Sequence, residues 1–382
     1  MSRRRWSLTD LAVPRALLLR LLTGVFFTFY AIGFLQDIFQ LGALSLRGLL
    51  TDAFFSGGIA TLWVFAFTRP KRQLVMLLPL LVAGQIAFSA IVRIHRTDPL
   101  QLSRDALRSR MQLDAVASGA SLTIGYVFLM SFLRAIGERY TRVHTEMRLA
   151  HEIHALLVPT ISRRIGQFEF FGVSSPSGEV GGDLIDLVER DGHWTAYIAD
   201  VSGHGVASGV LMGMVKSAAR MKLAGPVPLD VLLSDLNRVI EPLKTPNMFV
   251  TCACVQFDGS RRLSFSVAGH LPILRLTRHA PEIDELTVAQ VPLGFFESQT
   301  FAASHVLFQT GDLFLLVTDG LTEVFDERGE EFGIHALKDV VRRAADKPLD
   351  ELVAILLAKV RGHGKQLDDQ TILAVRCLEP GK

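Results

Sequence analysis

Cysteine is scarce in this chain: three cysteines occur among 382 residues. So few cysteines exclude a small secreted domain framed by disulfide bonds. Cys252 and Cys254 alternate with Ala253 and Val255 in a strand-like run, and no second cysteine pair or histidine partner stands at zinc spacing. We therefore interpret these two residues and Cys377 as packing residues in a reducing compartment.

Glutamate is absent from residues 1–133. This part holds 14 Lys and Arg and 6 Asp, a formal charge of +8, whereas residues 134–382 carry −6. The hydrophobic share of 49% and the mean hydropathy of +0.33 exclude an intrinsically disordered chain. Because the positive charge lies beside apolar runs and not on a polar domain, we expect no nucleic-acid partner.

Long apolar runs gather in the first third. Three of the four have 19 or 20 residues, enough for a bilayer core, and the second has 16. They are apolar on all sides, which disfavours a water-soluble four-helix bundle. The runs cover residues 17–36, 53–68, 74–92 and 115–133. We expect residues 1–134 to form a multi-pass membrane region with about four transmembrane helices.

Charged residues beside these runs bear on orientation. The basic start of the chain and the basic loop at residues 69–72 favour both termini on the cytoplasmic side. Five arginines between residues 93 and 110 argue against that orientation, because they would face outward. No small-residue cleavage site is followed by a polar mature chain, so a cleaved signal peptide is not expected.

Residues 135–160 have the pattern of a linker helix. Apolar positions recur at alternating steps of four and three, as in a coiled-coil seam. The seam residues are Ile136, Tyr140, Val143, Met147, Ala150, His154 and Leu157. A homodimer through this helix is one interpretation, and a rigid spacer is the other. The histidines at 151 and 154 are three apart, whereas a metalloprotease helix needs them four apart, so we reject a zinc site.

The remaining residues, 161–378, alternate between strand and helix patterns. Tight turns such as Asp258-Gly259 join successive strands, which indicates antiparallel sheets with helices in blocks, an α+β domain. We expect strands at 168–174, 184–188, 194–201, 249–257, 263–267, 271–276, 301–308, 312–317 and 371–377. We expect helices at 206–223, 229–240, 334–345 and 349–360.

Several acidic residues lie at the ends of expected strands, some of them next to glycines. A single Asp before Gly is most often a turn former, but acidic residues recur at separate strand ends. If they converge, their mutual repulsion requires cations, and an all-oxygen site selects Mg²⁺ or Mn²⁺. Two such ions can activate water for in-line attack on a phosphoryl group. The residues are Asp183, Asp186, Asp200, Asp319, Asp368 and Asp369.

A nucleotide-binding alternative is weaker. The glycines at 203, 205 and 209 follow a strand and open a helix, as in a dinucleotide-binding fingerprint. The third glycine comes one residue late, Asp200 would repel a pyrophosphate, and hairpins are incompatible with a parallel Rossmann sheet. No Gly-Lys-Ser or Gly-Lys-Thr phosphate-binding loop occurs anywhere.

Seven motifs in order resemble those of SpoIIE-like phosphatases, the bacterial branch of the metal-dependent PPM (type 2C) Ser/Thr protein phosphatases. They are 150–159 (AHEIHALLVP), 180–183 (VGGD), 199–205 (ADVSGHG), 247–251 (NMFVT), 268–272 (AGHLP), 318–323 (TDGLTE) and 368–371 (DDQT). The resemblance covers residues 150–378 and does not extend to the membrane region. It implies an α/β-β/α sandwich of two antiparallel sheets flanked by helices.

The resemblance also implies metal ligands for two Mn²⁺ or Mg²⁺ ions. Asp200 would be shared by both ions, and the Val201 carbonyl would bind one of them. Asp319 and Asp368 would complete one site, and Asp183 would hold the other ion directly or through water. Asp369 matches a position that need not bind metal.

The general acid is less defined by the resemblance. The wider PPM pattern has a histidine two residues after the shared aspartate, where this chain has Ser202. His204 and His270 are candidate catalytic residues, and a structural role in their loops is the alternative for each.

The resulting expectation is a bacterial phosphatase in the cytoplasmic membrane, with its catalytic domain in the cytoplasm. The family implies a phosphorylated STAS-type anti-sigma antagonist as substrate. One alternative is a catalytically degenerate regulator that binds phosphoproteins and sequesters them. Another is a transporter or receptor core with the phosphatase as an accessory. Charged residues inside the membrane would mark a transport pathway, but Arg20 is the only charged residue inside an expected span, so this alternative is not supported.

Overall fold

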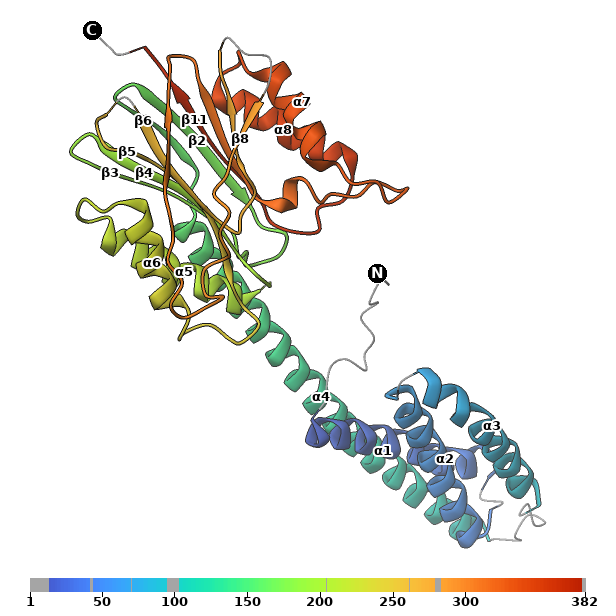
Figure 1. Cartoon of the computed structure of the whole chain (residues 1–382). Coiled ribbons are helices and arrows are strands. Elements are labelled where there is room, and N and C mark those ends of the chain that lie inside the picture. The colour runs from blue at the N-terminus through green and yellow to red at the C-terminus, as the bar shows by residue number, and fades with distance from the viewer. Residues whose placement is uncertain are drawn as a thin grey trace. The chain divides into compact units, whose positions relative to one another are not determined.

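The structure is a computed structural model that describes residues 14–41, 44–69, 71–94, 103–203, 205–260, 262–278 and 283–379. It divides into two compact units, Met1–Val143 and His144–Lys382, which we call unit 1 and unit 2 and describe separately (Figure 1). The expected domain boundaries at residues 134 and 160 stay predictions. The expected basic flank at residues 3–5 lies outside the described residues.

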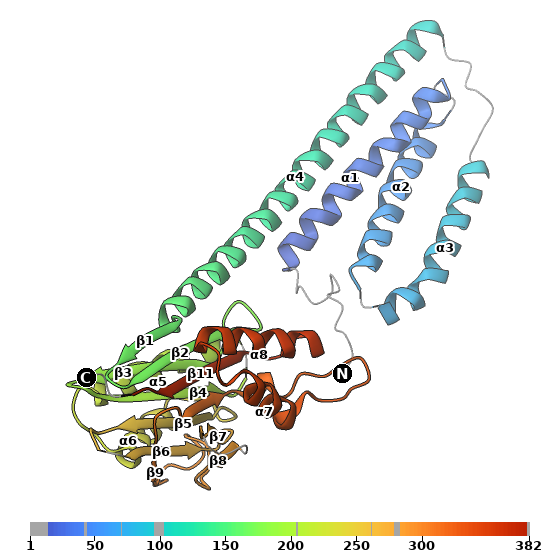
Figure 2. The same ribbon diagram turned by 90° about the horizontal axis from the view of Figure 1, so that it is seen from above.

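Unit 1 consists of long apolar helices. Three of the described helices are long and apolar enough to cross a membrane, namely α1 (Arg15–Phe39), α2 (Leu46–Phe67) and α4 (Arg104–Leu157). The fourth, α3 (Lys71–Ile94), has a shorter apolar stretch at Gln73–Ala87. Figure 2 shows α1, α2 and α3 side by side in that order. The structure therefore supports three candidate spans, and the expected fourth span stays a prediction.

Small residues bring the helices of unit 1 together. A Cβ atom on Gly33 of α1 would lie 2.5 Å from backbone atoms of Ala53 in α2. A Cβ atom on Gly125 of α4 would lie 2.8 Å from the Thr28 backbone nitrogen in α1. Such close approach at glycine is typical of helices packed in lipid, where no hydrophobic effect drives association.

Large apolar side chains cover the outside of unit 1. Phe39 is 83% exposed and Met76 is 81% exposed, and many further Leu, Phe and Val side chains on these helices are also exposed. A water-soluble bundle buries such side chains along one stripe of each helix. This surface fits a lipid environment.

Unit 2 is built from two antiparallel sheets. In both sheets, every pair of neighbouring strands is antiparallel. The first sheet has the strand order β1 (Ile161–Ile165), β2 (Phe168–Ser175), β11 (Gln370–Cys377), β10 (Leu313–Val317), β7 (Ile273–Leu276) and β8 (Ile283–Leu286). The second has the order β3 (Leu184–Arg190), β4 (His193–Val201), β5 (Val250–Phe257), β6 (Arg262–Ala268) and β9 (Ser304–Leu307).

Two pairs of helices cover the outer faces of the sheets. Helices α5 (Val206–Lys222) and α6 (Leu229–Ile240) lie on one side, and α7 (Gly333–Ala344) and α8 (Leu349–His363) lie on the other (Figure 1). One apolar core fills the space between the sheets and beneath α5 and α6, and a second lies beneath α7 and α8. The expected sandwich is confirmed. Sequence patterns missed only the short strands β1 and β8 among the described strands.

The end of α4 packs on unit 2. His154 is buried, and Leu157 approaches α5, where a Cβ atom on Gly213 would lie 3.4 Å from Leu157 Cδ1. The last two positions of the expected coiled-coil seam are therefore covered within unit 2 itself. Tyr140 and Met147, earlier in the seam, are exposed. All three cysteines are buried and form no disulfide bond.

Candidate functional site

Chain direction brings the acidic residues of both sheets to one end of the sandwich. Asp183 directly precedes β3, and Asp200 lies near the end of β4, where Leu184 pairs with Ala199. In the other sheet, Val317 at the end of β10 pairs with Ile372 in β11. Asp319 follows β10 and opens the short helix η1 (Asp319–Leu321), whereas Asp368 and Asp369 precede β11. Five of the six carboxylates predicted from strand ends thus occupy the same end.

A hydroxyl group links the two sheets at this end. Thr318 follows β10 and is buried, and its Oγ1 donates a hydrogen bond to Asp183 Oδ2 at 2.8 Å. The same Oγ1 accepts a hydrogen bond from the Thr371 backbone N–H at 3.1 Å. Thr318 therefore orients the Asp183 carboxylate against the first sheet.

The electrostatics of this end disfavour several negative charges at once. Burial raises the pKa of Asp183 well above its usual range, and the nearby charge of Asp200 raises it further. Burial likewise raises the pKa of Asp200 to about 7, with Asp319 and Asp368 adding repulsion. The pKa of Asp319 is also raised, by burial and by Asp368. These three carboxylates lie close enough to repel one another. The raised pKa values come from burial and from neighbouring aspartates, and no Lys or Arg side chain in the described part of the chain offsets them.

Asp369 has a different environment from its neighbour Asp368. Its Oδ1 accepts a hydrogen bond from the Ser177 N–H at 2.7 Å, and its Oδ2 accepts one from the Gly182 N–H at 2.7 Å. Asp369 is buried, whereas Asp368 is exposed. Asp369 therefore holds the backbone of the loop before β3, and this favours a positioning role over metal binding.

Glycines allow the backbone to close tightly at this end. A Cβ atom on Gly320 would lie 2.0 Å from the Asp369 carbonyl oxygen. A Cβ atom on Gly182 would lie 2.7 Å from the Val201 carbonyl oxygen. The segments that carry Asp319 and Asp368 thus contact each other through backbone, as do those that carry Asp183 and Asp200.

Asp186 turns away from this group. Burial opposes its ionisation, but hydrogen bonds from Arg220 and the charge of Lys216 outweigh burial and lower its pKa. Arg220 binds both carboxylate oxygens, at 2.7 and 2.8 Å, and the Tyr197 hydroxyl donates to Oδ2 at 3.1 Å. Asp186 therefore anchors α5 to the second sheet and does not join the acidic site.

The two candidate histidines stand differently. His204 lies outside the described residues. His270 Nδ1 lies 2.7 Å from the Thr251 hydroxyl, and burial lowers the pKa of His270 to about 4. Its imidazole is therefore neutral at neutral pH, which disfavours donation of a proton by an imidazolium ion and favours a structural contact with β5.

The contacts of two buried polar residues, His154 near the site and Lys216 beside Asp186, were not predicted from the sequence. His154 on α4 is buried, and both His154 Nε2 and Asp369 Oδ2 lie close to Gly181, at 3.1 and 2.4 Å from the position of a Cβ atom. Lys216 on α5 donates a hydrogen bond from Nζ to the Leu157 carbonyl at 2.5 Å and pairs with Asp186 at 3.2 Å. The sequence held one signal for the contact of His154 with this site, namely that a polar histidine occupies an otherwise apolar seam position.

A cavity of about 710 Å³ lies at the other end of the second sheet. Its lining includes Arg190 and His193 at the turn between β3 and β4, which is the far end of both strands from Asp183 and Asp200. Its volume is ample for a small molecule, but none of the six predicted strand-end aspartates lines it. The chemistry of the acidic end therefore does not take place in this cavity.

The donor set of the acidic end fits hard divalent cations. Carboxylate and carbonyl oxygens are the ligands that Mg²⁺ and Mn²⁺ prefer, and the raised pKa values of Asp183, Asp200 and Asp319 indicate negative charge that cations would relieve. Within the described residues, no three His, Cys, Asp or Glu side chains form a cluster tight enough to be a ready-made ion site. The residues therefore fit divalent cations by the chemistry of their oxygen atoms and by their location at one end of the sandwich, although the side chains are not drawn together around one point.

Comparison with known proteins agrees with this geometry. Residues 190–378 match the family described as Stage II sporulation protein E (SpoIIE). Phosphoserine phosphatase RsbU of Bacillus subtilis is 23% identical over 188 residues, which cover 49% of this chain and 56% of that protein. The chain spans about half the length of the curated relatives that it matches. The resemblance to SpoIIE-like phosphatases is thus confirmed for this part of the chain.

Solved structures share the fold of unit 2. The SiaA-PP2C domain of Pseudomonas aeruginosa has a TM-score of 0.55 and 23% sequence identity, covering 62% of this chain and 98% of that chain. The RsbU and RsbW domains of a Mycobacterium tuberculosis protein give a TM-score of 0.52 and 23% identity, covering 59% of this chain and 64% of that chain. Unit 2 therefore has the PP2C fold.

Proposed function

We propose that this chain, whose residues 190–378 match the SpoIIE family, is a metal-dependent protein serine/threonine phosphatase. The observation that carries the proposal is the convergence of carboxylates from four separate segments at one end of a PP2C fold. Asp183 and Asp200 come from the second sheet, and Asp319 and Asp368 come from the first. A protein that only binds phosphoprotein has no need of so many carboxylates in mutual repulsion.

The roles assigned to the residues follow from their positions. Two Mn²⁺ or Mg²⁺ ions held by Asp183, Asp200, the Val201 carbonyl, Asp319 and Asp368 would supply the positive charge that neutralises a phosphoryl group and lowers the pKa of water. Asp369 holds the loop that carries Asp183, and its assignment as a further ligand is the weaker alternative. His204 is the stronger candidate for general acid, because His270 is buried and neutral.

The membrane placement rests on unit 1. Three apolar helices of sufficient length support anchoring in a bilayer, with α3 as a fourth span. We assign unit 2 to the cytoplasm, because the start of the chain is basic and because regulatory phosphoproteins occur there. The apolar exterior of unit 1 and its close helix contacts at glycine support the membrane placement of unit 1.

The substrate proposed is a phosphorylated STAS-type regulatory protein. The support is the family resemblance and the similarity to the Bacillus subtilis relative, which is named as a phosphoserine phosphatase. We further propose a homodimer through the exposed part of the linker seam, where Tyr140 lies. Because the native cysteines are buried, a Tyr140→Cys variant offers one accessible thiol for crosslinking. Dimers crosslinked by Tyr140→Cys but not in the wild type support this interface, and monomers only would refute it.

The activity test uses full-length protein in detergent. Phosphate release from an aryl phosphate and from a phosphoserine protein is measured with Mn²⁺, with Mg²⁺ and with a chelator. We expect metal-dependent release by the wild type and at least a 100-fold loss in Asp200→Asn, because a shared ligand is removed. Asp191→Asn is the matched control, since Asp191 lies in an exposed turn at φ 53°, a conformation that Asn adopts readily.

The outcome separates the phosphatase from the sequestering regulator. Metal-dependent release that is lost in Asp200→Asn and kept in Asp191→Asn supports the phosphatase. If the wild type binds Mn²⁺ and phosphoprotein but releases no phosphate under any of these conditions, the phosphatase proposal fails and sequestration is favoured. Release that persists in the chelator would contradict metal dependence.

A further inference from the structure

Two consecutive aromatic side chains project from the surface of unit 2 beside the acidic end. Phe295 is 53% exposed and Phe296 is 58% exposed, and their ring centroids are 5.8 Å apart. The ring of Phe249 lies 5.6 Å from that of Phe295. We call these three residues the aromatic patch. Exposed aromatic clusters of this kind on a water-soluble unit commonly mark interaction sites.

The exposure of the aromatic patch is built into the fold. The fully buried Asn237 on α6 accepts a hydrogen bond at Oδ1 from the Gly294 N–H, at 2.7 Å. Its Nδ2 donates to the carbonyls of Phe296 and Glu297, at 2.9 and 3.3 Å. The side-chain amide of Asn237 thus forms hydrogen bonds, through both its oxygen and its nitrogen, with the backbone of the loop that carries Phe295 and Phe296. Gly294 has φ 80°, which allows the chain to turn there.

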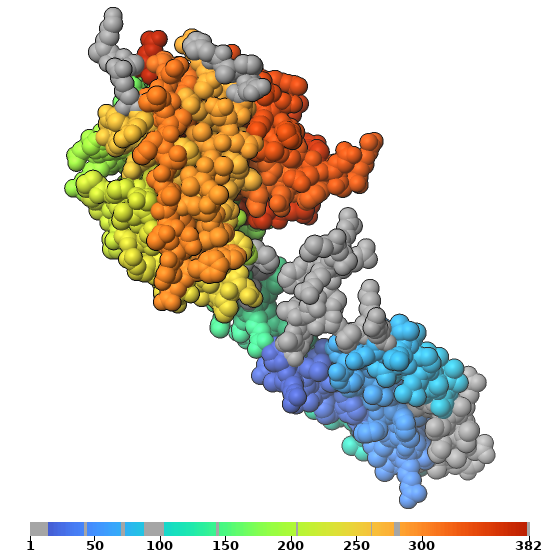
Figure 3. Space-filling view, in the orientation of Figure 1, coloured from blue at the N-terminus to red at the C-terminus, as the bar shows by residue number. Residues whose placement is uncertain are grey.

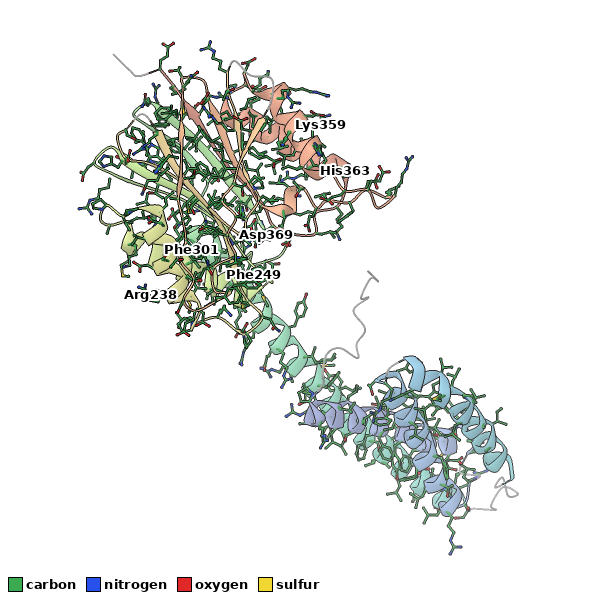
Figure 4. The ribbon with its side chains drawn as sticks, viewed as in Figure 1. Arg238, Phe249, Phe301, Lys359, His363 and Asp369 are labelled. Carbon is green, nitrogen blue, oxygen red and sulfur yellow. The ribbon has the colours of Figure 1, made fainter. Side chains whose placement is uncertain are left out.

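The aromatic patch is joined to the acidic end through backbone. The Ser202 N–H donates to the Phe249 carbonyl at 3.0 Å, and the Phe249 N–H donates to the Ser202 hydroxyl at 2.8 Å. Ser202 lies two residues after Asp200, and Thr251 pairs directly with Asp200. Figure 4 shows Phe249 and Asp369 at the same end of the two sheets. A protein that presents a phosphorylated residue to Asp200 would therefore have other residues near this patch.

The loop that carries Phe295 and Phe296 lies on the outer surface. In the space-filling view, residues near 295, in orange, and near 245, in yellow, adjoin each other at the lower end of unit 2 (Figure 3). The pairing of Val250 with Leu293 fixes this neighbourhood, with backbone hydrogen bonds of 2.8 and 3.0 Å. A partner can therefore reach the loop without any rearrangement of the core.

We propose that the aromatic patch docks an apolar segment next to the phosphorylated residue of the protein substrate. This inference rests on the proposed phosphatase function and adds a specificity site to it. Large aromatic side chains at the centre of a contact commonly supply most of the binding energy between proteins. An anionic lipid surface is less suited, because such surfaces attract clusters of Lys and Arg. Lys244, close to Gly294, and Glu297, next to Phe296 in the sequence, carry opposite charges.

The test compares two synthetic phosphoserine peptides of equal length and charge. One has leucines on both sides of the phosphoserine and the other has serines there. Full-length protein in detergent is assayed for peptide binding by fluorescence anisotropy and for kcat/KM with Mn²⁺. We expect the wild type to prefer the leucine peptide about 10-fold, through Kd and KM and not through kcat, since docking contacts form before reaction.

Three variants locate the preference. Phe295→Ser with Phe296→Ser should reduce the ratio between the two peptides to about one, and Phe295→Leu with Phe296→Leu should restore most of it. Leu307→Ser is the matched control, because Leu307 on the edge strand β9 is 71% exposed and β9 pairs with the opposite end of β6. This control should keep the wild-type ratio. Because each variant is judged by a ratio of two peptides, a general loss of folded protein does not imitate the expected result.

Several outcomes overturn the docking proposal. A wild-type ratio near one, or a ratio unchanged in the double serine variant, refutes it. If that variant instead loses binding to anionic vesicles with its peptide ratio unchanged, the patch contacts membrane. Failure of the phosphatase proposal is distinguishable, because it abolishes hydrolysis of an aryl phosphate by the wild type while the peptide binding ratio remains measurable.

Discussion

The Asp369 carboxylate accepts a hydrogen bond from the Gly182 amide at 2.7 Å, between residues 187 positions apart in the sequence. Gly182 belongs to the loop that leads into Asp183, and Asp369 follows the candidate ligand Asp368. The first sheet thus determines where the second sheet presents one of its carboxylates. Two adjacent aspartates consequently have separable tasks, one at the loop and one at the proposed metal site.

We expect Asp369→Asn to destabilise the metal-free protein, because its amide group cannot accept hydrogen bonds from Ser177 and Gly182 at both positions. A buried donor left unsatisfied costs about 1–3 kcal/mol. Asp368→Asn should leave the stability of the metal-free protein unchanged or slightly raised, since Asp368 is exposed and its charge repels Asp200 and Asp319, but should weaken activation by Mn²⁺. Thermal unfolding in a chelator and Mn²⁺ titration of phosphate release measure the two effects. Equal melting temperatures for both variants would refute the division of tasks.

Gly320 is expected to be intolerant of any side chain. A Cβ atom would lie 2.0 Å from the Asp369 carbonyl, so Gly320→Ala must push the segment of Asp368 away from that of Asp319. We expect the Mn²⁺ concentration for half-maximal activity to rise about 10-fold or more, as for other disturbances around metal ligands. Gly178→Ala is the control, because no atom lies within 4 Å of its added Cβ. Similar behaviour of the two variants would contradict this close contact.

Much of the fold was predictable because its patterns are local. Alternating apolar runs indicated most strands of both sheets, and glycine-rich turns indicated antiparallel order. The strand β1 (Ile161–Ile165) was missed because its three central residues are exposed and polar or charged, so apolar and polar residues do not alternate along it. The short edge strand β8 (Ile283–Leu286) was missed because it has only one buried residue.

The acidic site was predictable in composition but not in arrangement. Strand ends and motif order singled out Asp183, Asp200, Asp319 and Asp368, because each stands beside glycine or a buried strand. The hydrogen bonds of Asp369 to the loop before β3 were not predictable, since its partners lie almost two hundred residues away. Asp186 follows the same local pattern, yet two cations on α5 draw it into a structural ion pair.

The ion pair at Asp186 predicts a specific pH dependence of stability. Its pKa is lowered in the folded protein, so its stabilising contribution is present above the unfolded value near 3.8 and is lost as the pH falls through the lower folded value. We expect Asp186→Asn to cost about 3 kcal/mol at pH 7, because Lys216 is left buried without its anionic partner. The deficit should stay constant down to about pH 4 and shrink below it. Thermal unfolding between pH 3 and pH 7 measures this, with Asp191→Asn as the exposed control, and a deficit that grows on acidification would contradict the assignment.

Unit 1 offers a test of its helix packing that is independent of the phosphatase site. Gly33→Ala should destabilise the helices by about 1–3 kcal/mol, because the added methyl group would lie 2.5 Å from backbone atoms of Ala53 on α2. Gly58→Ala, on the same pair of helices, has no atom within 4 Å of its added Cβ, so its stability should be unchanged or slightly raised by the better helix propensity of alanine. Thermal unfolding in detergent, followed by tryptophan fluorescence, measures both variants. Because the two substitutions add the same methyl group to the same apolar bundle, equal effects would show that α1 and α2 do not pack through Gly33.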